Sequence, residues 1–457
     1  MARGDSMRRN IVHPGAGQLI YEIRQIVQFA HEVEGHGVPI TWENIGDPVS
    51  KGEQLPDWIR KIVARHAQEN SSYAYVDTQG VPATREFLAN QVNARGGAQI
   101  GREDIVFFNG LGDAVSKVFG YLRREARVLG PSPAYSTHSS AEAAHSGYDH
   151  LTYRLDPAND WLPDVSDIEM KIRYNDSIAG LLLINPDNPT GAVYPRSLLR
   201  EFVRIARTYD IFLVCDETYA NVAYNGEPFV SLAEVIEDVP GMSLRSISKE
   251  FPWPGARCGW AEVFNQHNDE NFATYIRSII DAKRLEVCST ALPQLVIPEV
   301  FGDPRYEDHL ERRRRMFEQR ANEAYESFAA VPGVRVMRPR GALYFTVLFE
   351  SGLLDGTMSL PVADQSLRAL LEARTEHVAA DKRFAYWLLG STGICVVPLT
   401  GFACDLPGFR ITLLETDEEK RRWTLRAIAD AIAVYLASGS MGTNDAVRMA
   451  SETIALT

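Results

Sequence analysis

The sequence predicts an α/β protein, with a large domain whose mostly parallel sheet is sandwiched by helices and a smaller α+β domain. Two near-continuous apolar runs, at residues 178–184 and 211–215, are typical of strands buried on both faces of a sheet. These runs alternate with segments of helical periodicity, which favours parallel strands joined by helices. After residue 303 a long charged helix is followed by short strands mixed with helices, which indicates the second domain.

The elements follow in chain order from their apolar spacing. The first helix, at 19–33, has apolar residues at helical intervals and ends before Gly35 and Gly37. The same spacing predicts helices at 57–68, 82–94, 112–124 and 196–209. Short apolar runs predict strands at 104–108, 126–129, 178–184, 211–215 and 242–247. The second domain is expected to hold helices at 309–328 and 423–437, and strands at 334–339, 342–349, 394–399 and 409–414.

The length and the pattern together predict the domain organisation. A chain of 457 residues has room for two or three domains. We expect a large domain over residues 70–320, and a small domain formed by residues 1–69 together with 321–457. The polar, helix-rich stretch at 355–385 is interpreted as an insertion, and residues 438–449 as a loosely attached tail.

The composition excludes several classes of partner. The chain holds 47 Lys and Arg against 60 Asp and Glu, a net charge of −13. That balance argues against nucleic-acid and anionic-membrane partners, which need clustered cations. No stretch approaches the ~20 apolar residues of a membrane helix, and no apolar signal segment follows the basic first ten residues. Five scattered cysteines without a C-x-x-C pair fit free thiols, so we expect a cytoplasmic location.

Three loops that follow predicted strands carry polar groups suited to chemistry. Residues 185–191 (N-P-D-N-P-T-G) form a stiff turn that presents the Asn188 amide. Asp216 ends a buried strand, where a carboxylate is costly unless it meets a cation. Lys249 follows another strand and is a candidate for Schiff-base chemistry. Because the carboxyl ends of parallel strands meet at one edge of the sheet, we expect these groups to lie together.

A phosphate cradle is predicted beside them. Ser246, Ser248 and Arg257 surround Lys249 in sequence and offer two hydroxyls and a guanidinium. Gly110 and Gly112, at the start of a helix, let the backbone approach an anion at the helix N-terminus. A phosphate cradle, a buried carboxylate, an amide and a reactive lysine together suit pyridoxal 5′-phosphate (PLP).

These motifs resemble those of class I/II aminotransferases, in the fold-type I group of PLP enzymes. The resemblance rests on N-P-D-N-P-T-G, on D-E-T-Y at 216–219 and on S-I-S-K-E-F-x-x-P-G-x-R-x-G-W at 246–260, in the family's order. It covers most of the chain, from about residue 45 to 437, and implies an aminotransferase that works by a ping-pong mechanism.

The resemblance also implies roles for individual residues. Lys249 forms the Schiff base with PLP and moves the proton, and Asp216 pairs with the pyridinium nitrogen. Tyr219 and Asn188 hydrogen-bond the ring's 3′ oxygen, and Tyr135 stacks on the ring. The phosphate contacts are the following: the backbone at Gly110, Leu111 and Gly112, and the side chains of Ser246, Ser248 and Arg257.

On the substrate side, the resemblance assigns Arg410 to the α-carboxylate, with Asn188 and Gly46 beside the substrate. Tyr75 matches a tyrosine that reaches the phosphate of the neighbouring subunit, with Tyr73 as a rival candidate, so a homodimer is implied. Amino acids and 2-oxo acids are the implied small-molecule partners. Tyr344, Trp253 and Tyr73 are compatible with an aromatic-lined pocket or with ordinary packing.

Two other hypotheses remain open at this point. The same motifs occur in other fold-type I enzymes that act on amino acids, namely C–S lyases, decarboxylases, oxidases and synthases. A non-enzymatic ligand sensor on this fold would be expected to carry a basic DNA-binding module, which the residues ahead of Gly46 do not resemble. The sequence does not name the amino acid.

Two further clusters are not expected to be sites. His31, Glu32 and His36 lack the H-E-x-x-H spacing of a zinc helix, so no metal is expected. The basic run at 312–315 is flanked by glutamates and is interpreted as a solvated helix face.

Overall fold

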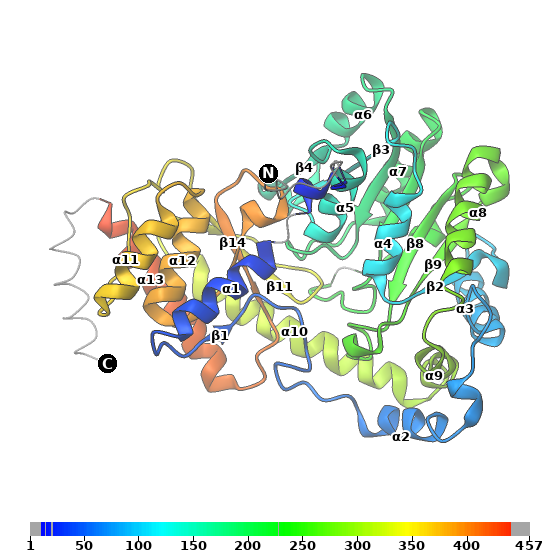
Figure 1. Ribbon diagram of the computed structural model, residues 1–457, viewed down its shortest axis with the longest axis horizontal. Helices are drawn as coiled ribbons and strands as arrows, with labels where there is room; N and C mark the ends of the chain where they lie inside the picture. The colour runs from blue at the N-terminus through cyan, green and yellow to red at the C-terminus, as the bar shows by residue number, and fades with distance from the viewer. Residues whose placement is uncertain (1–10, 14, 20–21, 227, 440–457) are drawn as a thin grey trace, which may run out of the picture.

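A computed structural model describes residues 11–13, 15–19, 22–226 and 228–439. Its core is an eight-stranded sheet at the right of Figure 1. In spatial order the strands are β2 (Ile105–Phe108), β9 (Gly259–Phe264), β8 (Gly241–Ser246), β7 (Phe212–Asp216), β6 (Ile178–Ile184), β3 (Arg127–Ser132), β4 (Thr152–Asp156) and β5 (Leu162–Pro163). Strands β8, β7, β6, β3 and β4 are parallel, whereas β9 and β5 run against their neighbours. The predicted mostly parallel sheet is confirmed.

Helices cover both faces of this sheet because its central strands are apolar on both sides. In β6, Leu181 and Leu183 belong to one core cluster, while Leu182 and Ile184 belong to the other. The first face is covered by α2 (Asp57–His66), α3 (Pro82–Ala94), α6 (Val165–Arg173), α7 (Arg196–Thr208) and α9 (Ala291–Phe301). The second face is covered by α4 (Leu111–Gly120) and α8 (Glu270–Leu285), with α5 (Ser136–Ser146) beside α4.

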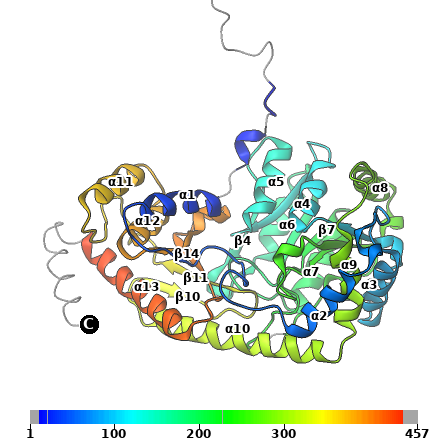
Figure 2. The same cartoon turned by 60° about the horizontal axis from the view of Figure 1, so that its bottom comes forward.

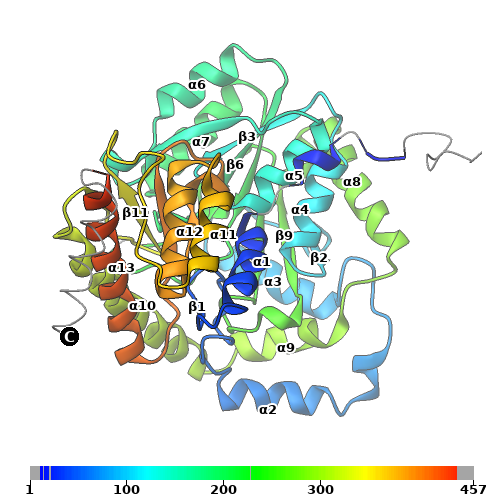
Figure 3. The same ribbon diagram turned by 60° about the vertical axis from the view of Figure 1, so that its left-hand side comes forward.

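A second, smaller sheet lies at the left of Figure 1. Its order is β10 (Val334–Val336), β11 (Tyr344–Phe349), β14 (Gly408–Thr412) and β13 (Val397–Pro398), all antiparallel. Strand β1 (Thr41–Trp42) pairs in parallel with β12 (Ile394–Cys395). The helices of this part are α1 (Glu22–Glu34), α11 (Gln365–Thr375), α12 (Ala380–Thr392) and α13 (Glu418–Ser438), and Figure 3 shows α1 beside α12.

Helix α10 (Arg305–Ala329) joins the two parts and runs beneath both of them (Figure 2). The predicted domain boundary at residue 320 falls inside this helix. Helix α2, which the predicted boundary places with the small domain, packs against α9 on the large sheet. The domain limits and the insertion at 355–385 stay predictions, and the predicted tail lies outside the described residues from 440 onward.

The parallel register brings three strand ends to one edge of the large sheet. Ile184 of β6 pairs with Asp216 of β7, and Asp216 pairs with Leu244 of β8. The loops that begin at Asn185 and Ile247 therefore leave the sheet side by side. This edge faces the small sheet and the segment at 43–53.

Candidate active site

A cavity of about 580 Å³ lies at this edge of the large sheet. It brings together side chains that are far apart in the sequence. Of the sequence-predicted residues, its lining includes Gly46, Leu111, Gly112, Tyr135, Asn188, Asp216, Tyr219, Ser246, Ser248, Lys249, Arg257 and Arg410. Gly110 immediately precedes the lining residues of α4.

Lys249 reaches into this cavity from the loop after β8. Its Nζ donates a hydrogen bond to the backbone oxygen of Gly46. The pKa of Lys249 is lowered to about 8, mainly by burial and also by the positive charges of Arg257, Arg410 and Arg313, while the carboxylate of Asp47 opposes the shift. A substantial share of the amine is therefore neutral near pH 8, as a nucleophile or proton acceptor requires.

Asp216 is held as a buried carboxylate. Its Oδ2 lies 2.8 Å from Nε2 of His138, and its Oδ1 accepts from the backbone and hydroxyl of Thr218 at 3.0 and 2.6 Å. Burial raises the pKa of Asp216, but the hydrogen bonds with His138 and Thr218 outweigh burial and leave the pKa below its ordinary value. The carboxylate is ionised and can hold a protonated ring nitrogen nearby.

Arg410 sits on β14 and is buried, with 1% of its surface exposed. Its Nη1 donates to Asn188 Oδ1 at 3.2 Å, and its Nη2 donates to the backbone oxygen of Asn44. The guanidinium carbon lies 4.3 and 5.1 Å from the ring centroids of Tyr344 and Phe402. Arg410 lines the cavity, where its guanidinium can receive a carboxylate.

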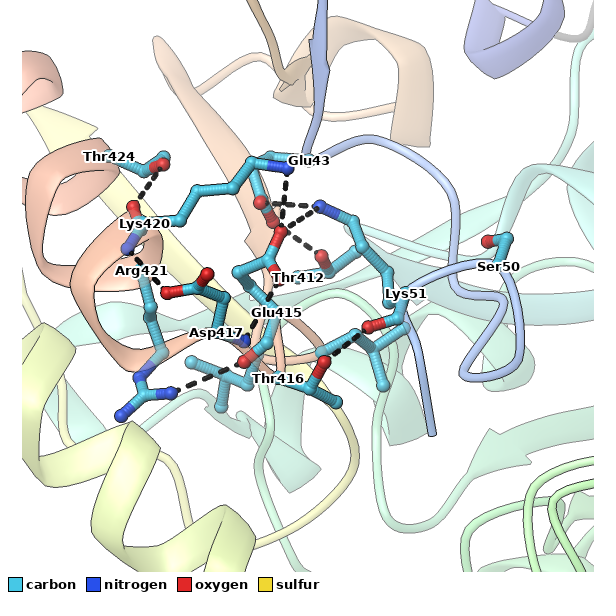
Figure 4. Close-up of polar contacts among 12 residues, drawn as sticks. Glu43, Ser50, Lys51, Thr412, Glu415, Thr416, Asp417, Lys420, Arg421 and Thr424 are labelled. Carbon is cyan, nitrogen blue, oxygen red and sulfur yellow. Dashed lines mark hydrogen bonds and ion pairs between the residues drawn. The ribbon is translucent and has the colours of Figure 1, made fainter. Parts of the chain in front are cut away.

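The segment 43–53, which we call the strap, passes over Lys249 and Arg410. Figure 4 shows the buried ion network that fixes its start. Glu43 accepts from Lys51 Nζ and from Thr412 Oγ1, each at 2.6 Å. Lys51 also lies 3.6 Å from Glu415, which pairs with Lys420 at 3.0 Å. Because Thr412 is two residues beyond Arg410 on β14, the network fixes the strap against the strand that carries Arg410.

The far end of the strap is held by Arg313. Its Nε donates to Glu53 Oε1 at 2.6 Å, and its Nη1 donates to the backbone oxygen of Lys249. The interpretation of residues 312–315 as a solvated face is wrong for Arg313, which is 4% exposed, because it lies on the buried stripe of α10 with Leu310 and Phe317. Arg314 and Arg315 do pair with glutamates at the surface.

Sequence reasoning also missed His138 and Thr218, the partners of Asp216. No motif marked His138, which lies on α5 among small polar residues. Conversely, two of the three aromatic pocket candidates are not among the lining residues: Trp253 packs against the large core, and Tyr73 is 75% exposed. Tyr344 does line the cavity. Tyr75 is 83% exposed and lies outside the cavity of its own chain.

The residues present fit PLP. At the start of α4, Gly110 has φ +82°, and a Cβ there would lie 2.3 Å from Arg257 Nη2, so only glycine allows this close cradle. The hydroxyl oxygens of Ser246 and Ser248 lie 2.7 Å apart in the wall of the same cavity. The N-terminus of α4 adds positive potential for a phosphate. Among the described residues, both polar atoms of the buried Asn44 amide in the cavity wall lack a hydrogen-bond partner, which a bound ligand would supply.

In the described part of the chain, no group of three or more His, Cys, Asp and Glu side chains is placed to hold a metal ion. No helix within the described ranges has the length and apolar character that a membrane crossing needs.

The sheet edge and its cavity have the arrangement that a PLP-dependent enzyme of fold type I requires. Residues 43–428 match the family described as "Aminotransferase class I and II", and the chain belongs to that family. It is 53% identical to an aminotransferase of Methanocaldococcus jannaschii, over 94% of this chain and 100% of that protein. It is 31% identical to the glutamate-pyruvate aminotransferase AlaA of Escherichia coli K12, over 71% of this chain and 79% of that protein. The crystal structure of an E. coli aminotransferase superposes with a TM-score of 0.80 at 25% identity, over 94% of this chain and 98% of that one.

Proposed function

We propose that the enzyme transfers the amino group of L-alanine to 2-oxoglutarate, and in reverse that of L-glutamate to pyruvate. The observation that carries this proposal is that Lys249 lines one cavity together with the hydrogen-bonded pair of Arg410 and Asn188, which suits an α-amino acid held by its carboxylate. The choice of substrates is supported by the E. coli relative, whose name gives glutamate and pyruvate.

Bound PLP supplies an electron sink for the charge that develops on the substrate Cα. In the proposed mechanism Lys249 is the covalent anchor of the cofactor and then the base that removes the Cα proton and returns it. Arg410 grips the α-carboxylate with its two-pronged fork, and Asn188 orients that fork. The second half of the ping-pong cycle uses the same groups in the opposite direction.

The remaining assignments concern the cofactor itself. Asp216, kept ionised by His138 and Thr218, holds the ring nitrogen protonated. Tyr219 and Asn188 donate to the ring's 3′ oxygen, and Tyr135 stacks on the ring. The proposed phosphate contacts are Ser246, Ser248, Arg257 and the backbone of Gly110, Leu111 and Gly112, with Gly46 beside the substrate.

A screen of amino donors tests the substrate. With 2-oxoglutarate as acceptor, kcat/KM for L-alanine is expected to exceed that for L-aspartate, L-leucine and L-phenylalanine by about tenfold or more, the discrimination that a pocket gives for a few heavy atoms. Formation of the 2-oxo acid and of glutamate in equal amounts is measured in the same assay. A different best donor contradicts the substrate assignment. Release of ammonia or carbon dioxide without an acceptor contradicts transamination.

We further propose that the enzyme is a homodimer in which the Tyr75 hydroxyl of one subunit hydrogen-bonds the cofactor phosphate in the site of the other subunit. The support is the exposure of Tyr75, 83%, two residues after Tyr73, which is 75% exposed. Loss of the Tyr75 hydroxyl in Tyr75→Phe is expected to weaken cofactor binding about 5- to 10-fold, the value of one hydrogen bond.

Mixed dimers of Lys249→Ala and Tyr75→Phe subunits distinguish the two possible arrangements. If Tyr75 acts across the interface, each mixed dimer keeps one fully normal site, and cofactor affinity at that site equals the wild-type value. If Tyr75 acts within its own chain, no site is normal. A fully active monomer in sedimentation also contradicts the proposal.

We also propose a cytoplasmic location. All five cysteines are free, and Cys215, Cys258, Cys395 and Cys404 are buried, as fits a reducing compartment. Cell fractionation that recovers the enzyme outside the cytoplasmic marker fractions would contradict this location.

A further inference from the structure

Two tyrosine hydroxyls meet in the wall of the cavity. The hydroxyl oxygens of Tyr219 and Tyr344 are 2.8 Å apart, and the two rings meet edge to face, 5.7 Å between centroids at 81°. Both residues are buried, with 5% and 3% of their surface exposed. Tyr219 comes from the loop after β7 of the large sheet, whereas Tyr344 begins β11 of the small sheet. The pair therefore bridges the two sheets.

Tyr344 also contacts the residue that we assign to the substrate carboxylate. Arg410 lies on β14, which pairs with β11, and its guanidinium carbon is 4.3 Å from the centroid of the Tyr344 ring. The strap approaches the same ring from another side. A Cβ on Gly46 would lie 2.1 Å from the Tyr344 hydroxyl, so a side chain at position 46 would displace that hydroxyl.

We propose that Tyr344 is a positioning residue of this enzyme: its hydroxyl orients the hydroxyl of Tyr219, and its ring supports the guanidinium of Arg410. This inference rests on the proposed function, which gives Tyr219 the ring oxygen of the cofactor and Arg410 the carboxylate of the amino acid. Tyr344 contacts both of these side chains, Tyr219 through its hydroxyl and Arg410 through its ring.

The hydroxyl groups of Tyr344 and Tyr219 form a hydrogen-bonded pair in which each can change the donor strength of the other. A phenol has one proton to donate, and a hydrogen bond accepted by its oxygen makes that proton a stronger donor. When Tyr344 donates to Tyr219, the proton of Tyr219 is directed to its other neighbour. Burial, together with Tyr344, raises the pKa of Tyr219 well above its ordinary value, so Tyr219 keeps the proton that it is to donate.

The test is Tyr344→Phe, which removes one oxygen atom and keeps the ring. Without the Tyr344 hydroxyl, Tyr219 is a weaker hydrogen-bond donor, so it stabilises the ionised 3′ oxygen of the cofactor ring less. The pH midpoint of the visible absorbance of the holoenzyme is therefore expected to rise by about 0.5 to 1 pH unit, the equivalent of one hydrogen bond. KM for the amino acid is expected to stay within about twofold, because the ring beneath Arg410 is retained.

Three further variants separate orientation from general damage. Tyr344→Leu, which loses the ring as well, is expected to raise KM about tenfold in addition to the shift of the midpoint. Tyr219→Phe should raise the midpoint by itself, and adding Tyr344→Phe to it should then change the midpoint little, because the two hydroxyls act in series. Tyr174→Phe, at a tyrosine that is 80% exposed, is the matched control and should leave both values unchanged.

The outcomes are distinguishable. If Tyr344→Phe leaves the pH midpoint of the visible absorbance at its wild-type value, the inference is overturned and the proposed function stays intact. Equal shifts from Tyr344→Phe in the wild-type and Tyr219→Phe backgrounds overturn it as well, since Tyr344 would then not act through Tyr219. A wild-type holoenzyme without any pH-dependent visible band counts against the proposed function and, with it, against this inference.

Discussion

Lys249→Ala is expected to lower kcat for transamination about 10⁴-fold or more, because one substitution removes both the covalent anchor and the proton carrier. The visible absorbance of the bound cofactor should no longer respond to added L-alanine. Steady-state rates and absorbance spectra of the purified variant measure both effects. Lys61→Ala, at an exposed lysine on α2, is the control and should behave as wild type. Amine transfer at the wild-type rate by Lys249→Ala would contradict the proposed mechanism.

The lowered pKa of Lys249 predicts that cofactor binding depends on pH. Only the neutral amine can attack the cofactor, and the folded protein holds the pKa of Lys249 at about 8. The rate at which the cofactor-free protein takes up PLP should therefore rise about tenfold for each pH unit from pH 6 toward pH 8, and it should level off above pH 8. The rate of appearance of the visible band, measured from pH 6 to pH 9, tests this. A rate that does not change over that range would contradict the assignment of the attacking group.

The second large effect is expected at Arg410. Arg410→Gln should lower kcat/KM for L-alanine about 10²- to 10³-fold, mostly through KM, because a buried charge partner of the carboxylate is lost. Arg410→Lys should recover only part of the loss, since an ammonium keeps the charge but not the fork. The rate of the first half-reaction, followed by absorbance, gives the comparison.

A substrate without a carboxylate provides the internal control for Arg410. Ethylamine has the amine and methyl group of alanine but nothing for the guanidinium to hold. Its slow half-reaction should change less than about threefold in Arg410→Gln, because the missing interaction was never made. If the variant lost activity equally with both amines, Arg410 would act on the fold or the cofactor rather than on the carboxylate. A melting curve of the variant separates these two explanations.

The parallel core of the fold could be predicted from sequence because its signal is local. The strand predicted at 178–184 has the bounds of β6, and the helix predicted at 196–209 ends within one residue of α7. Both are long apolar or amphipathic patterns. The antiparallel strand β9 and helices α8 and α9 were not predicted. Helix α9 contains Pro293 and Pro298, which argue against a helix in sequence, and Glu262 interrupts the apolar run of β9.

In the site, too, some residues could be predicted from the sequence and others could not. Asn188, Asp216 and Lys249 could be predicted to meet because parallel strands end at one edge of a sheet. The partners that tune them could not, because each depends on a distant contact. His138 lies 78 residues from Asp216, and Arg313 lies 260 residues from Glu53. For Arg313 a weak signal was available, since its position falls on the apolar stripe of α10.

The strap has a consequence for how this enzyme tolerates mutation. The strap contacts Arg410 and Lys249 through main-chain oxygens: the oxygen of Asn44 accepts from Arg410, and the oxygen of Gly46 accepts from Lys249. Replacing the side chain of Asn44 or Asp47 leaves both oxygens in place, so a scan of those positions would understate the importance of this segment. A proline or a one-residue deletion between Asn44 and Asp47 moves the carbonyls themselves. Such backbone changes, more than side-chain replacements, are the informative variants for exploring or redesigning the mouth of the cavity.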